Sequence, residues 1–271
     1  MLRTFHAITA AVTLTLGSVG LQVSLAPPAD AAPGPVLKAC YNLRSMTTND
    51  RLVNGPYRLT VFDGAVDLRQ SVVMNGPSGP EVYEAVSWTK FDPASTSNGS
   101  YLALYCNGDL SFRRSDGTLL WHSNTAGRGV VRLSLTSGGT LLLQNAKGEA
   151  VWQSASGRAA MPANSILPSN TRLLSSTYDV VGAVPQTLAM QTDGNLIYRD
   201  GTTVKWQSNT HVKGSSARLT TKAQLQVVSP AGKTLWSSAP TGTSYSVLDI
   251  VRASIWQYFP TQKFVWGLGA P

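Results

Sequence analysis

Residues 190–206 read MQTDGNLIYRDGTTVKW, and the rest of the chain is best understood by comparison with this stretch. Gln191, Asp193 and Asn195 occupy alternate positions of a segment with strand-like composition, which predicts that their side chains point to one face of a strand. Two amides and a carboxylate in a row donate and accept several hydrogen bonds but include no nucleophile. The stretch therefore favours a small polyhydroxylated ligand. The alternative interpretation is that residues 192–195 form only a polar turn.

Tryptophan spacing reveals an internal repeat. Six of the seven tryptophans recur at intervals of 30 to 33 residues, in two series of three: Trp88, Trp121 and Trp152, then Trp206, Trp236 and Trp266. Most of these are preceded by a strand pattern, a short polar step, a second apolar strand pattern and a turn that contains glycine. The first repeat is the most divergent and carries an insertion around Asn75 to Pro80. The chain is predicted to be all-β, with two blocks of three repeats.

The repeats also predict where the core lies. A sheet of three or four strands cannot bury both of its faces, so three such sheets need to close around a shared axis. One Trp from each sheet, converging on that axis, would supply the centre of the core. The six spaced tryptophans are accordingly interpreted as core residues and not as ligand-stacking residues, while Trp256 falls outside the spacing.

The first 31 residues have the pattern of a secretory signal peptide. Arg3 precedes an apolar run from Ala7 to Leu25, and small residues lie just before Ala32. A transmembrane anchor is the alternative, but polar residues and two prolines interrupt the run, and no later stretch reaches about 18 apolar residues. A lipoprotein signal at Cys40 is disfavoured because Cys40 lies far beyond the apolar run. The mature protein is predicted to be secreted and extracellular.

The domain boundaries follow from the two blocks. Each block opens with a Leu-rich strand pattern followed by a Tyr-containing one. Residues 38–156 are predicted to form the first domain, residues 157–168, which contain two prolines, a linker, and residues 169–271 the second domain.

Charge and cysteines bound the partners and the compartment. Only 13% of residues are charged, and the net charge of +8 comes from scattered cations with no basic run, so nucleic acid is not the predicted partner. The two cysteines, Cys40 and Cys106, are expected to pair in an oxidising compartment, with two free thiols as the alternative. Closing a loop of this length would contribute about 4 kcal/mol in the chain-entropy model.

The repeats resemble those of the bulb-type (monocot mannose-binding) lectin family. That family carries Gln-x-Asp-x-Asn-x-Val-x-Tyr, followed by a Trp strand like WHSNT at 121–125 and WQSNT at 206–210 here. The resemblance covers nearly all of the mature chain as two tandem copies. It implies two tandem β-prism II domains, each of three small antiparallel sheets around a pseudo-threefold axis. It also implies that a glycan or a cell-surface polysaccharide is the partner, with no metal or cofactor.

Only one repeat keeps the polar set of the family motif. Gln191, Asp193 and Asn195 match the residues that bond mannose hydroxyls in the family, and Ile197 replaces the Val that packs on the sugar ring. The Tyr position is ambiguous. It holds Arg199 when counted forward from Gln191 and Tyr198 when counted back from the Trp.

The ambiguity arises because this repeat is one residue short. Gln191 to Trp206 spans 15 residues, whereas the equivalent span in four other repeats is 16. A deletion inside a strand would turn every later side chain to the opposite face, while the Asp200-Gly201 turn would absorb it at little cost. We therefore expect Arg199 at the Tyr position, where it would bond a hydroxyl or favour an acidic glycan.

The other repeats have lost the motif and are expected to be structural. Tyr105, Asn107 and Asp109 form a scrambled version of the set, for which a different specificity is the alternative. We expect a lectin without catalysis. A lectin-like bacteriocin acting through surface glycans and a hydrolase are the other hypotheses, and the hydrolase is disfavoured because no catalytic motif is present. In the family, C-terminal strands are exchanged, so Lys263 to Leu268 is the candidate for exchange between domains or in a homodimer.

Overall fold

The computed structural model describes strands, turns and loops at residues 36–40, 51–62, 64–76, 78–92, 100–154, 156–176, 185–239, 242–250, 254–257 and 263–267. Every regular element in these ranges is a β-strand, and no membrane-spanning apolar helix occurs among them. The predicted signal peptide lies outside the described residues. The all-β prediction is confirmed.

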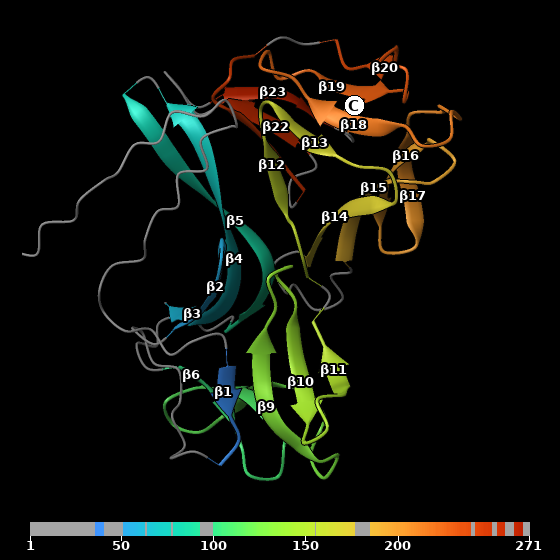
Figure 1. Ribbon diagram of the computed structural model, residues 1–271. Coiled ribbons are helices and arrows are strands. Elements are labelled where there is room, and N and C mark those ends of the chain that lie inside the picture. The colour runs from blue at the N-terminus through green and yellow to red at the C-terminus, as the bar shows by residue number, and fades with distance from the viewer. Residues whose placement is uncertain are drawn as a thin grey trace, which may run out of the picture. The chain divides into compact units, whose positions relative to one another are not determined.

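The first three repeats form three antiparallel sheets (Figure 1). The first sheet has the order β2 (Arg51–Asn54), β3 (Tyr57–Phe62), β4 (Ala65–Gly76), β5 (Gly79–Phe91). The second has the order β6 (Tyr101–Leu104), β7 (Leu110–Arg113), β8 (Leu119–His122). The third has the order β1 (Val36–Lys38), β9 (Val130–Leu135), β10 (Leu141–Asn145), β11 (Ala150–Gln153). Together these sheets are the first prism.

The last three repeats form three four-stranded sheets in the same way. The first has the order β14 (Thr171–Ser176), β15 (Pro185–Met190), β16 (Leu196–Asp200), β17 (Thr203–Gln207). The second has the order β13 (Ser165–Leu167), β18 (Ser216–Leu219), β19 (Leu225–Val228), β20 (Thr234–Ser237). The third has the order β12 (Ala160–Pro162), β21 (Ser246–Asp249), β22 (Ser254–Gln257), β23 (Lys263–Gly267). These sheets are the second prism.

Three tryptophans meet at the centre of each prism, as their spacing predicts. The ring centroids of Trp88, Trp121 and Trp152 lie 5.6 to 6.4 Å apart. Those of Trp206, Trp236 and Trp266 lie 4.9 to 6.3 Å apart. Most of the contacts are edge-to-face, the arrangement that aromatic quadrupoles favour. Trp88 is 3% exposed, and the other five are partly buried and pack against the hydrophobic core. The predicted convergence of one Trp from each sheet is confirmed, and we call the two groups the first and second Trp triads.

The segment expected to be a linker contributes strands to the second prism. β12 pairs with β21, and β13 pairs with β18, so each becomes the fourth strand of a sheet. The prediction of a linker at 157–168 missed these strands because they are only three residues long and pair with partners far along the chain. The prolines at 162 and 168 lie at or beyond the ends of these edge strands, where a missing N–H costs little.

The C-terminal strand stays within its own prism. β23 pairs with β22, so exchange of this strand between the two domains does not occur. Its exchange in a homodimer stays a prediction. The expected disulfide between Cys40 and Cys106 is present and ties the segment after β1 to the turn between β6 and β7.

The insertion in the first repeat is an arm that reaches the second prism. β4 and β5 form a long hairpin whose last paired residues are Gly76 and Gly79, which confirms the predicted position of the insertion. Val72, Met74 and Ala85 of this arm belong to the hydrophobic core of the second prism. The arm therefore contributes buried residues to the hydrophobic core of the second prism.

Polar contacts also fix the arm. The buried Gln70 side chain accepts hydrogen bonds from the backbone N–H groups of Ala159 and Ala160 at 2.7 and 3.2 Å and donates to the carbonyl of Ala160. The Tyr83 hydroxyl donates to the Asp249 carboxylate. The two prisms therefore share both apolar core and buried hydrogen bonds.

The second Trp triad should dominate the stability of its prism. We expect Trp236→Ala to lower the free energy of unfolding by about 3 kcal/mol or more, because it removes two aromatic contacts and leaves a cavity on the axis. Trp236→Phe should cost less. Val204→Ala, at a side chain that is 47% exposed, is the control and should change the thermal midpoint little. Equal losses for Trp236→Ala and Val204→Ala, measured by thermal unfolding, would contradict the assignment.

Candidate functional site

The motif residues lie in a turn. β15 ends at Met190 and β16 begins at Leu196, so Gln191 to Asn195 form the connection. The N–H of Gln191 donates to the carbonyl of Asn195 at 2.9 Å, and the N–H of Gly194 donates to the carbonyl of Gln191 at 3.1 Å. The expectation that three polar side chains alternate along a strand is wrong, and the turn geometry that was the alternative is present. We call this segment the 191–195 turn.

Gly194 explains why the chain turns here. Its φ of 94° lies in the left-handed region that glycine adopts without strain. A Cβ at this position would run into the backbone of Val212, which packs against the turn. The N–H of Gly214 donates to the carbonyl of Thr192 at 3.4 Å. The loop after β17 therefore packs against the turn and holds its backbone in place.

Asn195 faces inward. It is 4% exposed, its Nδ2 donates to Gln207 Oε1 at 3.1 Å, and its Oδ1 accepts from the Ser208 hydroxyl at 3.0 Å. The Ser208 hydroxyl also accepts from the N–H of Leu196, which begins β16. Asn195 thus joins the turn to the end of β17.

Gln191 and Asp193 face outward. They line an open cavity of about 580 Å³ together with Asn170, which precedes β14, and with Thr171 and Arg172 of β14. The Asp193 side chain is 54% exposed. Its Oδ1 accepts the N–H of Asn195 at 2.9 Å, while its Oδ2 lies 4.0 Å from Nδ1 of His211. One carboxylate oxygen therefore holds the turn, and the other is available to a ligand.

Sequence reasoning missed the β14 side of this cavity. Arg172 pairs with Ala189 across β14 and β15, and Asn170 follows the same antiparallel pairing toward the turn. The Leu-rich strand at the start of the second block was recognised in the sequence. Extending the antiparallel register of this strand by one residue pairs Asn170 with Gln191. Asn170 and Arg172, two residues apart, then lie on the same face of the strand.

The second half of the motif continues along β16. Ile197 is 5% exposed, so it offers little surface to a ligand. Tyr198 pairs with Trp206 and belongs to the core of the prism. Burial, with a contribution from Asp200, raises the pKa of Tyr198 to about 12. The Tyr198 ring is therefore committed to the core.

Arg199 occupies the position that the short repeat predicted. It pairs with Thr187 and Val204, and its alternation with Tyr198 places it on the outward face. The β16–β17 turn contains only residues 201 and 202, because Asp200 pairs with Thr203. The equivalent turn in the next repeat contains residues 230–232, between Ser229 and Lys233. The prediction that the turn absorbs the missing residue is confirmed.

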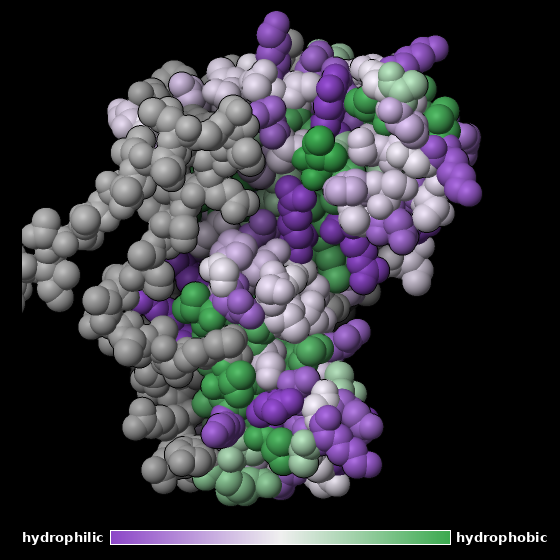
Figure 2. All heavy atoms as spheres, in the orientation of Figure 1, coloured by the Kyte–Doolittle hydropathy of each residue, from purple (hydrophilic) through white to green (hydrophobic). Residues whose placement is uncertain are grey.

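The surrounding surface suits a hydrophilic ligand. In Figure 2, hydrophilic and weakly polar residues are interspersed over the region of β14 to β17. Groups that fix the orientation of a ligand are typically few and convergent in such a site. Gln191, Asp193, Asn170 and Arg172 are the convergent groups here.

The same turn recurs in three other repeats with different side chains. Its pair of backbone hydrogen bonds is present at residues 105–109, 136–140 and 220–224. In each, the hydroxyl of the serine two residues after the Trp accepts from the first N–H of the next strand: Ser123 from Leu110, Ser154 from Leu141 and Ser238 from Leu225. The turn therefore forms without Gln at its first position or Asp at its third.

Comparison with known proteins identifies the family. No protein-family model matches the chain. A mannose-specific lectin from Remusatia vivipara is 30% identical over 177 residues, which are 49% of this chain and 69% of that lectin. The chain belongs to the bulb-type lectin family.

The chain is also similar to another curated lectin and to solved lectin structures. The mannose-specific lectin CEA of Colocasia esculenta is 28% identical over 211 residues, 58% of this chain and 80% of that protein. Among solved structures, the two-domain fetuin-binding lectin of Scilla campanulata is 18% identical and the match covers 87% of this chain and 97% of that one, with a TM-score of 0.33.

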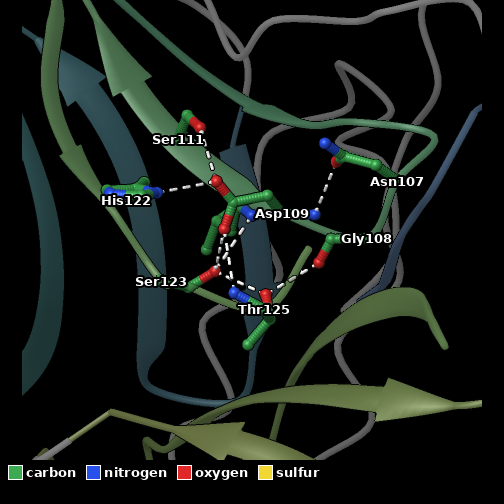
Figure 3. Close-up of polar contacts among 8 residues, drawn as sticks. Asn107, Gly108, Asp109, Ser111, His122, Ser123 and Thr125 are labelled. Atoms are coloured by element: carbon green, nitrogen blue, oxygen red, sulfur yellow. Dashed lines mark hydrogen bonds and ion pairs between the residues drawn. The ribbon is translucent and has the colours of Figure 1, made fainter. Parts of the chain in front are cut away.

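In the second repeat, the bulb-type lectin turn has a carboxylate at the Asn position. Asp109 is 9% exposed and lies among donors (Figure 3). Its Oδ2 contacts Nδ1 of His122 at 2.9 Å, and its Oδ1 accepts from the Ser123 hydroxyl and the Thr125 N–H, both at 3.0 Å. Asn107, at the Asp position, accepts the N–H of Asp109. Asp109 therefore forms internal hydrogen bonds that correspond to those of Asn195.

The hydrogen bonds around Asp109 set its titration. Burial acts to raise the pKa of its carboxyl, but the bonds from Thr125, His122 and Ser123 outweigh burial and lower that pKa below its ordinary value of 3.8. A carboxyl whose pKa is lower in the folded state stabilises the fold above its ordinary pKa and loses this contribution as the pH falls through the folded value. The free energy of unfolding of the first prism should therefore decrease as the pH falls below the ordinary pKa of this carboxyl.

Two substitutions at Asp109 test this titration. Asp109→Asn should fold, because the first repeat of the second prism has Asn195 at the same position. Between about pH 5 and pH 3, the thermal midpoint of this variant should fall less steeply than that of the unmodified protein. Asp109→Ala should cost about 1 to 3 kcal/mol at pH 7, because Ser123 and Thr125 lose a buried partner. The measurement is the thermal midpoint of each variant across pH. An unchanged acid slope in Asp109→Asn would show that another group governs it.

Proposed function

We propose that this protein is a secreted carbohydrate-binding lectin, without catalytic activity, that recognises mannose-like glycans through the 191–195 turn of its second prism. The observation that carries the proposal is that Gln191 and Asp193 open onto a cavity, whereas the same backbone turn elsewhere forms with other residues at these positions. Because the turn does not require this pair, its presence points to a ligand. The signal-peptide pattern of residues 1–31 supports export.

The chemistry of the turn suits vicinal hydroxyl groups. The Oδ2 atom of Asp193 accepts from a hydroxyl, and the amide of Gln191 both donates and accepts beside it. Asn195 holds the turn in place through Gln207 and Ser208 and contributes by positioning. Arg199, half-buried on the outward face of β16, offers further donors.

The names of the relatives point to the same class of ligand. The relatives from Colocasia and Remusatia are named mannose-specific lectins, which supports a mannose-like sugar here. They give no support to the bacteriocin alternative. A single shallow site binds weakly, so affinity for a polysaccharide would come from several copies engaging together.

Asp193 provides the direct test of the site. Asp193→Ala should reduce the affinity for a methyl mannoside at least tenfold, because a hydroxyl acceptor is lost. Lys222→Ala is the matched control, since Lys222 holds the same position in the next repeat and should leave binding unchanged. The measurement is isothermal titration calorimetry with the mature protein. Equal effects of the two variants, or no mannoside binding by the unmodified protein, would overturn the proposal.

Residues 198 and 199 test which side chain faces the ligand. Tyr198→Phe should leave glycan affinity unchanged, because the Tyr198 ring lies in the core. Arg199→Ala should weaken binding several-fold, because it removes donors from the outward face. Both variants should keep the thermal midpoint within a few degrees of the unmodified protein. Loss of binding in Tyr198→Phe with full binding in Arg199→Ala would reverse the assignment.

A further inference from the structure

A second cavity borders the same strand as the cavity at the 191–195 turn. It has a volume of about 420 Å³ and is lined by residues of the first prism, by Arg158 and by Thr171 and Arg172 of β14. Thr171 and Arg172 also line the first cavity. The two cavities therefore share part of one edge strand, and we call them together the groove. We call the second cavity the junction cavity.

The junction cavity is built from both prisms. Tyr57, Thr140 and Ser156 come from the first prism, and Arg158 lies just before β12. Thr140 belongs to the turn of the third repeat, and the Tyr57 ring packs so closely against Gly139 that a Cβ there would overlap it. The turn of that repeat therefore forms a wall of the junction cavity.

The junction cavity holds a cation without a countercharge. Arg158 is half-buried, and its guanidinium donates to the carbonyls of Ala160 and Ile166 at 3.3 and 3.1 Å. No carboxylate among the described residues forms an ion pair with Arg158 or Arg172. Burial lowers the pKa of the Arg158 guanidinium, an effect that the nearby Tyr57 phenol only partly offsets. A cation removed from water in this way gains from an anionic partner.

Charge is distributed unevenly along the groove. Asp193 is the acidic residue of the first cavity, and the described lining of the junction cavity contains no Asp or Glu. Arg172 lines both cavities, and Arg158 lines the junction cavity. A ligand with hydroxyls at one end and a negative group at the other matches this order. A neutral monosaccharide would use only the Gln191 end.

We propose that the groove binds an oligosaccharide of at least two sugars, whose neutral end occupies the 191–195 turn and whose carboxylate, phosphate or sulfate group lies in the junction cavity against Arg172 and Arg158. This inference rests on the proposed lectin function and adds the class of glycan. The planar guanidinium forks of arginine hold such groups with paired hydrogen bonds. Recognition then requires both prisms, because the first prism supplies one wall of the cavity.

A matched pair of sugars tests the inference. β-1,4-Linked mannotriose and the same trisaccharide with mannuronate as one terminal sugar have the same linkage and length, and they differ by one carboxylate at C6 of that sugar. We call the second one the mannuronate trisaccharide. The mature full-length protein should bind the mannuronate trisaccharide at least about tenfold more tightly at low salt. The preference should shrink as ionic strength rises. Calorimetric titration of both sugars gives the ratio of affinities.

The variants separate the two arginines from overall charge. Arg172→Gln should lower the affinity for the mannuronate trisaccharide far more than the affinity for mannotriose, which brings the preference to near parity. Arg218→Gln removes the same charge from an exposed position on β18, where Arg218 contacts Gln226, and should keep the preference. Arg172 is exposed and makes no ion pair in the described part of the chain, so its substitution is expected to leave the fold intact.

The outcomes distinguish the inference from the proposed function. Binding of both trisaccharides with equal affinity, or equal losses in Arg172→Gln and Arg218→Gln, would overturn the inference and leave the lectin function standing. Binding of neither trisaccharide nor a methyl mannoside would overturn both. A mannuronate preference that Arg172→Gln abolishes and Arg218→Gln preserves would establish the groove.

Discussion

The two Trp triads are the contacts on which the rest of the structure depends. Each sheet has three or four short strands and one apolar face, and no such sheet is stable alone in water. Placing one indole from each sheet on a common axis lets three weak sheets bury their inner faces against each other. The residues on the outward faces and in the turns are not needed for the core, so they can differ between repeats.

The turn between the second and third strands of a sheet shows how that freedom is used. Its backbone is held by two hydrogen bonds and by a serine from the Trp strand, as at Ser208 and Ser123. In this turn, the side chain at the Asn position forms internal hydrogen bonds, whether it is Asn195 or Asp109. The side chains at the Gln and Asp positions stay outside. The proposed ligand contacts of the second prism are thus concentrated in Gln191 and Asp193.

The arm of the first repeat makes the two prisms interdependent. Val72 and Met74 complete the core of the second prism, and Gln70 satisfies backbone groups next to β12. The same contact region brings Tyr57 and Thr140 toward Arg158. A turn that lost its own sugar motif therefore acquires a place in the wall of a cavity.

The sequence by itself determined the features that depend on local pattern and spacing. The all-β class, the six repeats, the Trp triads, the position of the insertion and the deletion in the β16–β17 turn all follow from residue period and separation. Only the tertiary structure decided that Gln191 to Asn195 form a turn, that Asn195 faces inward, that β12 and β13 complete distant sheets and that Arg172 lies beside the site. The physical reason is that strand pairing and burial join residues far apart in the chain. Whether a polar side chain faces the solvent or the interior then depends on residues far away in the chain, which the adjacent sequence does not specify.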